Sequence, residues 1–83
     1  MRMFSLCKGQ DGATYHLFEG VVDQDGVCRK TSTHSICRKE DRENNICLDQ
    51  CLVIKEMRLR VARLANAGEQ ICGICVSTMY RNQ

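Results

Sequence analysis

Cysteine is the residue type in this sequence that could carry out the most chemistry. The chain of 83 residues holds seven cysteines and two histidines. Thiolates and imidazoles bind Zn²⁺, and cysteines in small folds also form disulfides or fill the core. An odd number of cysteines cannot pair completely within one chain, which favours metal ligands or free thiols in a reducing compartment over a secreted disulfide scaffold. We therefore expect a cytoplasmic protein with zinc as its cofactor.

Five candidate ligands fall in the middle of the chain. Cys47 and Cys51 are four residues apart, so on a helix both side chains would share one face and could form half of a metal site. The preceding segment can supply the remaining ligands. Core thiols and disulfides are the alternatives. The predicted metal ligands are Cys28, His34, Cys37, Cys47 and Cys51.

A second group combines the two ends of the chain. The sequence CGIC at residues 72–75 is a C-x-x-C motif. It can contribute two ligands to a metal site or, at a helix N-terminus, perform disulfide exchange through a thiol of lowered pKa. The first strands offer one cysteine and one histidine as partners. The candidate second metal or redox site is Cys7, His16, Cys72 and Cys75.

The distance between the two cysteine pairs decides whether they could share one ion. If residues 45–67 form a single helix, its ends lie about 33 Å apart, at about 1.5 Å per residue. The connection from Gly68 to Cys72 spans at most about 14 Å, so Cys72 could not reach an ion held by Cys47. The sequence therefore predicts separate sites rather than one four-thiolate centre.

A small set of elements must position these ligands. The first part of the chain alternates apolar and polar residues, with turns at residues 8–12 and at the Asp-Gly pair 25–26. Residues 1–32 are therefore predicted to form a three-stranded antiparallel β-meander. A polar, cysteine-bearing connection follows over residues 33–44.

The longest uninterrupted pattern covers residues 45–67 and predicts a long α-helix. The segment contains no glycine or proline, starts at Asn45 as a candidate N-cap, and is followed by Gly68. Apolar residues recur at spacings of three and four along one face. The tail over residues 68–83 fits either a strand or a turn followed by a helix. The predicted fold class is α+β, a single domain over residues 1–83 with the meander packed on the helix and zinc as a candidate staple.

A second apolar face of the predicted helix is too wide for a small sheet to cover. An uncovered patch would mark a protein contact or a homodimer seam. Basic side chains beside it could instead contact a phosphate, although the stem of Arg58 could simply pack at the edge of the main stripe. The predicted partner-binding residues are Leu48, Leu52, Leu59, Lys55, Arg58, Arg60 and Arg63.

Charge and motif content restrict the function. The 12 basic and 10 acidic residues give a net charge of +2, which is too balanced to indicate nucleic-acid binding by itself. We find no phosphate-binding glycine loop, no nucleophile–base set and no apolar run of about 18 residues, so we expect neither an enzyme nor a membrane span.

We predict a small intracellular non-catalytic binding module, a class common among phage and plasmid factors, that acts as a regulator or inhibitor by binding a protein partner. The first alternative is a nucleic-acid-binding regulator that uses the basic helix residues. The second is a thiol-disulfide or metal-handling protein that uses Cys72 and Cys75.

Overall fold

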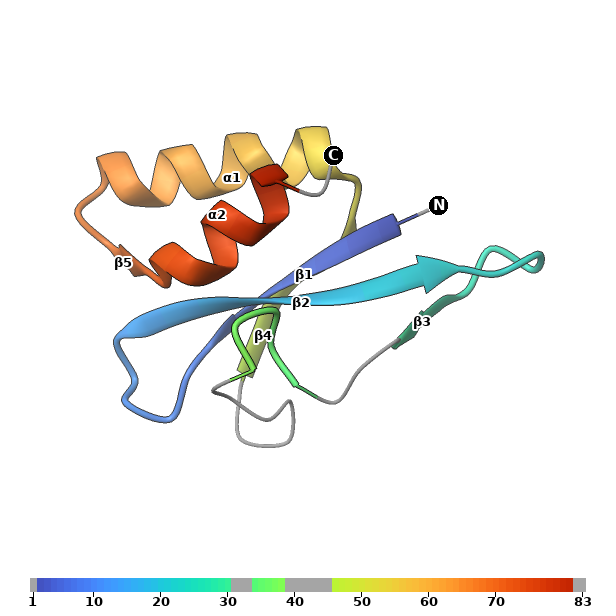
Figure 1. The fold of residues 1–83 in the computed structure, drawn as a ribbon, viewed down its shortest axis with the longest axis horizontal. Coiled ribbons are helices and arrows are strands. Elements are labelled where there is room, and N and C mark those ends of the chain that lie inside the picture. Colours follow the sequence, from blue (N-terminus) through green and yellow to red (C-terminus); the bar gives the residue numbers. More distant parts are fainter. Residues whose placement is uncertain (1, 31–33, 39–45, 82–83) are drawn as a thin grey trace.

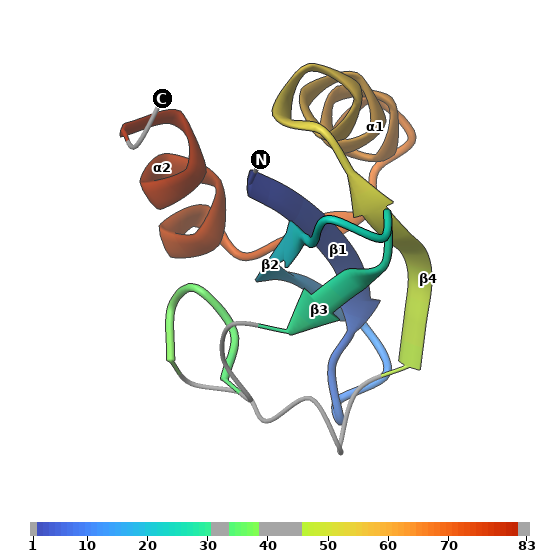
Figure 2. The same ribbon diagram turned by 90° about the vertical axis from the view of Figure 1, so that its right-hand side faces the viewer.

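The chain forms a mainly antiparallel sheet with two helices against one face (Figure 1, Figure 2). The computed structural model describes residues 2–30, 34–38 and 46–81. The elements are β1 Arg2–Lys8, β2 Thr14–Val22, β3 Cys28–Lys30, β4 Ile46–Leu52, α1 Ile54–Asn66, β5 Gln70–Ile71 and α2 Gly73–Arg81. Within the described residues the sheet is five-stranded, in the order β3-β2-β1-β4 with β5 also paired to β2. The predicted α+β class is confirmed, but the strand count and the helix length differ from the prediction.

Local turn chemistry forms the two N-terminal hairpins. Between β1 and β2, the Asp11 carboxylate accepts hydrogen bonds from the backbone N–H groups of Ala13 and Thr14, and Gly12 adopts a φ of 70°. Between β2 and β3, the Asp23 carboxylate accepts from two backbone N–H groups, and Gly26 has a φ of 78°. Both turns need a residue that tolerates positive φ, which is why the sequence marks them clearly.

The segment predicted as the first part of the long helix is instead strand β4. It pairs antiparallel with the free side of β1, with Cys7 opposite Cys47 and Phe4 opposite Leu52. The register shifts twice along this pair, and Cys51 takes a φ of 59°. Such a bulge breaks the period of two that identifies a strand. The spacing of four between Cys47 and Cys51 therefore fits a helix pattern although the backbone is extended.

Helix α1 begins later than predicted and ends where predicted. Its N-cap is Val53, which makes no side-chain capping hydrogen bond, so no capping residue marks the true start. At the other end Gly68 has a φ of 85°, and the backbone N–H of Glu69 donates to the carbonyl of Leu64. This left-handed glycine stops the helix after 13 residues.

The core lies between the sheet and the two helices. The side chains at alternate positions of β1 and β2 point toward the helices, where buried residues of α1 and α2 meet them. The buried residues of this cluster are Phe4, Leu6, Tyr15, Leu17, Met57, Val61, Cys75 and Met79. No helix in the described ranges is long and apolar enough to span a membrane.

The tail follows the turn-and-helix alternative. A short strand, β5, first pairs in parallel with the beginning of β2, with Tyr15 opposite Ile71. Helix α2 then starts directly after Cys72. The C-x-x-C motif is therefore placed at the N-terminus of α2, beside the outer edge of β2.

Candidate metal centre

The candidate site occupies a gap on the outer edge of β2. Within the described residues, strand β3 pairs with Gly20–Val22 and β5 pairs with Thr14 and Tyr15, and the gap lies between these two positions. Two other segments attach on either side of the gap. The backbone N–H of Ile36 donates to the carbonyl of Leu17, and that of Cys72 donates to the carbonyl of Tyr15, both at 2.8 Å. The two attachment points, Leu17 and Tyr15, flank His16 in the sequence. Figure 2 shows the segment 34–38 next to the start of α2.

Four side chains converge at this gap. The ligand atoms of the four residues all lie within 4.8 Å of one another: His16, Cys37, Cys72 and Cys75. The His16 Nδ1 atom is 3.4 Å from the Sγ of Cys37 and 3.8 Å from the Sγ of Cys75. For a tetrahedral ion with Zn–S bonds of about 2.3 Å and Zn–N bonds of about 2.0 Å, S···N and S···S separations of about 3.5–3.8 Å are expected. This group could hold a metal ion.

Burial controls the charge state of the group. His16 and Cys75 are buried, and Cys37 and Cys72 are half-buried. Burial raises the pKa of the Cys75 thiol to about 12, so without a cation this residue is a neutral thiol at physiological pH. A metal ion would supply the positive charge that a buried thiolate needs, and would displace the proton on binding.

Neighbouring groups orient the thiols. The Ser35 side chain is buried, and its Oγ lies 3.1 Å from the Sγ of Cys37. The C-x-x-C backbone is fixed at the first turn of α2, where the N–H of Val76 donates to the carbonyl of Cys72. Contacts of this kind around metal ligands hold the side chains in their binding orientation.

The other four cysteines form two disulfides, Cys7–Cys47 and Cys28–Cys51. The first joins neighbouring strands β1 and β4, and the second joins β3 and β4, the outermost strands of the four-strand order. All seven cysteines lie in the described residues, and three of them remain as thiols. The odd number of cysteines favoured metal ligands over disulfides in the sequence analysis. In the structure, four cysteines form two disulfides and the other three are candidate metal ligands.

The structure regroups the predicted ligands. It separates the first predicted set, because Cys28 and Cys51 bond to each other, Cys47 bonds to Cys7, and His34 is exposed outside the cluster. The predicted half-site of Cys47 and Cys51 required a helix, whereas β4 gives each a different disulfide partner.

The second predicted set loses Cys7 to a disulfide and gains Cys37. The sequence had already grouped His16 with the C-x-x-C motif. Cys37 was assigned elsewhere because its approach depends on the backbone bond between Ile36 and Leu17, which no local pattern indicates.

The predicted partner-binding residues divide into three kinds. Leu59 is 56% exposed, whereas Leu52 is half-buried and packs against the core. Arg58 is half-buried, with its guanidinium carbon 4.4 Å from the centre of the Tyr80 ring, so it joins α1 to α2. The remaining basic side chains, Lys55, Arg60 and Arg63, are exposed. The side chain of Leu48 lies outside what the structure describes.

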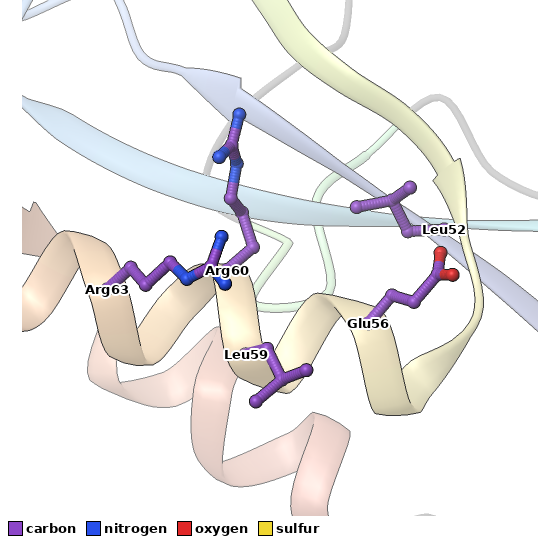
Figure 3. A pocket seen from close by; sticks show the side chains of 5 residues that line it. All are labelled: Leu52, Glu56, Leu59, Arg60 and Arg63. Carbon is purple, nitrogen blue, oxygen red and sulfur yellow. The ribbon is translucent and has the colours of Figure 1, made fainter.

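Two surface hollows lie next to α1 and next to the candidate metal centre. A groove of about 230 Å³ on the outer side of α1 is lined by Leu52, Glu56, Leu59, Arg60 and Arg63 (Figure 3). A second hollow of about 630 Å³ lies beside the candidate metal centre and is lined by Cys72, Gly73, Ile74, Ser77, Thr78 and Arg81. The described lining of this second hollow includes no carboxylate and no histidine.

No family model matches the sequence, and no curated protein or solved structure matches it either. Functional inference therefore rests on the residues and geometry of the chain itself.

Proposed function

We propose that this protein is a small non-catalytic binding module whose fold is held by one zinc ion. The observation that supports this proposal is the convergence of one nitrogen and three sulfur atoms within 4.8 Å. These atoms come from β2, the segment 34–38 and the start of α2, which are distant in sequence. A bound ion would link all three segments at one point.

The donor set favours zinc in a structural role. Thiolate ligands select zinc, copper(I) or iron–sulfur clusters, and three thiolates with one imidazole form a common structural zinc site. Four protein ligands leave no coordination position open for water or substrate, in contrast to catalytic zinc sites. A domain of this size also gains from such a link, because its single core is small.

A redox role for the C-x-x-C motif is less well supported. Disulfide exchange requires a thiolate at neutral pH, and active cysteines of this type have lowered pKa values. The pKa of Cys75 is raised instead, chiefly by burial, so Cys75 is not suited to be the attacking thiolate of such an exchange. Its sulfur is also inaccessible, since Cys75 is fully buried.

The disulfides indicate the kind of cellular compartment in which the protein functions. Disulfides persist in oxidising compartments, so the two pairs argue against the cytoplasmic location expected from the cysteine count. Alkylation of the unfolded protein under non-reducing conditions, with a chelator present, should modify the three thiols and leave the paired cysteines unmodified. Modification of all seven cysteines would show that the disulfides do not form, and would again favour a cytoplasmic location.

We place the binding surface on the outer side of α1, where the protein would act as a regulator or inhibitor by occupying a protein partner. Leu59 is exposed there at the edge of a groove, which suits an apolar contact (Figure 3). A phosphate backbone is a poorer fit, because Arg58 is packed on Tyr80 and Glu56 lies within the groove.

Metal analysis tests the zinc proposal directly. Protein purified without chelator should contain one equivalent of zinc per chain, and Co²⁺ substitution should give the thiolate charge-transfer and d–d bands of a tetrahedral site. Cys75→Ser should lose both signals. Less than about a tenth of an equivalent in the wild-type protein would refute the proposal.

Salt dependence separates the two kinds of partner. Binding that involves phosphate contacts weakens steeply as ionic strength rises, with a slope set by the number of contacts. An apolar protein contact around Leu59 should change little over the same range. A steep slope that disappears in Arg60→Ala or Arg63→Ala would favour the nucleic-acid alternative.

A further inference from the structure

The groove on α1 carries both signs of charge around one exposed leucine. Glu56, Leu59 and Arg63 follow one another at spacings of three and four, so they form a single stripe along the helix. Glu56 and Arg63 are exposed at its two ends, and Leu59 is 56% exposed between them. Figure 3 shows these side chains on the same side of α1, with Leu52 beside Glu56.

The two charged side chains have no partner within the part of the chain that the structure describes. The ion pairs there join Arg2 to Glu19 and Arg29 to Asp23, and neither involves the groove. Water can solvate both exposed charges, but a partner that places a base opposite Glu56 and an acid opposite Arg63 would pair with both. Arg60 also lines the groove and already has an interaction within the chain. A wholly acidic partner would be attracted to the arginines but repelled by Glu56, and a basic partner would be attracted to Glu56 but repelled by the arginines.

A second copy of the same stripe satisfies both ends at once. In an antiparallel pair of α1 helices with a twofold axis at Leu59, residue 56 of one copy lies opposite residue 62 of the other. That position is one residue, about 1.5 Å along the axis, from Arg63. Each Glu56 would therefore face the Arg63 of the other copy, while the two Leu59 side chains meet at the centre. This is the self-complementary pattern that a twofold interface requires.

We propose that the protein forms a twofold homodimer through the stripe Glu56, Leu59 and Arg63, with the two α1 helices antiparallel. This inference rests on the proposed binding role of α1 and names its partner as a second copy of the chain. The metal centre lies at the edge of β2, away from the stripe, so dimerisation and zinc content can be measured independently.

Charge reversal tests the pairing. Sedimentation equilibrium of the zinc-loaded protein up to about 100 μM should show a monomer–dimer equilibrium. Glu56→Arg and Arg63→Glu each replace two symmetry-related attractions by two repulsions, so each should weaken dimerisation about tenfold or more. Glu69→Lys reverses an exposed charge just beyond the end of α1 and outside the groove, and should leave the dimer intact. Leu59→Ala should also weaken the dimer without lowering the unfolding midpoint measured at concentrations where the wild-type protein is monomeric.

Restoring complementary charges at positions 56 and 63 tests whether the partner is a second copy of the chain. The double variant Glu56→Arg/Arg63→Glu should dimerise again, because its pairs are reversed but complementary. An equimolar mixture of the two single variants should form a heterodimer, since one then supplies only basic and the other only acidic ends. A monomer at all concentrations, or single variants that dimerise as well as the wild type, would overturn the proposal. A zinc-loaded monomer would leave the proposed binding of a different protein standing.

Discussion

Replacing one cysteine of the metal centre should abolish the dependence of the unfolding midpoint on bound metal. Cys37 is the most informative ligand to change, because it is half-buried and belongs to the segment whose Ile36 N–H donates a backbone hydrogen bond to the Leu17 carbonyl of β2. Cys37→Ser preserves the size of the side chain, but its neutral hydroxyl does not replace a zinc thiolate. We expect zinc binding to weaken by at least about three orders of magnitude, since structural sites depend on all of their ligands.

The size of the effect follows from binding linkage. An ion present at about 1,000 times its dissociation constant stabilises the folded state by about 4 kcal/mol. For a domain of this length, each kcal/mol corresponds to about 4–8 °C in the unfolding midpoint. Chelator should therefore lower the midpoint of the wild-type protein by about 15–30 °C, whereas the midpoint of Cys37→Ser should change little.

Thermal unfolding followed by circular dichroism, with and without chelator and without reductant, measures this difference. The matched control is Cys28→Ser/Cys51→Ser, which removes a disulfide of sequence separation 23 and leaves the cluster untouched. Loop-closure entropy predicts a loss of about 3 kcal/mol for this control, equal with and without chelator, and it should retain one zinc. If chelator leaves the wild-type midpoint unchanged, or if Cys37→Ser still binds zinc as tightly, the four residues are not a metal site.

Three further changes test the fold around the site. Met57→Ala empties a fully buried position in the core and should lower the free energy of unfolding by about 2–5 kcal/mol; equal denaturant midpoints would show that α1 does not pack as described. Gly20→Ala would place a Cβ atom 2.8 Å from the backbone oxygen of Arg29, so β3 must move, and chemical denaturation should show a loss of about 1–3 kcal/mol. The pKa of Asp11 is lowered from 3.8 to about 2 by hydrogen bonds from Thr14 and Ala13, so its stabilising effect is complete above pH 3.8 and is lost as the pH falls through 2. Carboxyl NMR should find that midpoint, and Asp11→Asn should remove this part of the pH dependence; a titration near 3.8 would contradict the turn geometry.

The parts of the fold that the sequence predicted well are those determined by neighbouring residues. Both hairpin turns depend on an aspartate that accepts backbone hydrogen bonds and a glycine with positive φ a few residues later. The end of α1 likewise depends on Gly68. Each of these signals is contained in a few consecutive residues, so no tertiary contact is needed to recognise it.

The error in the helix had a tertiary cause. Residues 46–52 are extended because β1 offers them a free edge, and this pairing joins positions about 40 residues apart. A bulge then hides the strand period, and Val53 does not mark the start of α1 with a cap. The apolar spacing therefore continued from a strand into a helix without any local sign of the boundary.

Cysteine pairing depends on the same strand. Cys7 can meet Cys47 only when β4 lies beside β1, and Cys51 can meet Cys28 only when β4 approaches β3. With residues 45–67 predicted as a helix, zinc ligation was favoured over the disulfide and core-thiol alternatives, and neither of these pairings was predicted. The ligand set was thus affected by a secondary-structure error, although the grouping of His16 with Cys72 and Cys75 did not depend on it.

The sequence placed Cys47 and Cys72 in separate sites because a long helix would hold them apart, and that reason fails since α1 has only 13 residues. The disulfides supply a different reason. Cys47 is bonded to Cys7, so its sulfur cannot act as a thiolate ligand, whereas Cys72 keeps its thiol and lies with His16, Cys37 and Cys75. Strand order alone would not separate two cysteines, because Cys28 and Cys51 are bonded although β3 and β4 are the outermost strands of the four-strand order. The pairing of Cys47 with Cys7 is therefore what keeps it out of the metal centre.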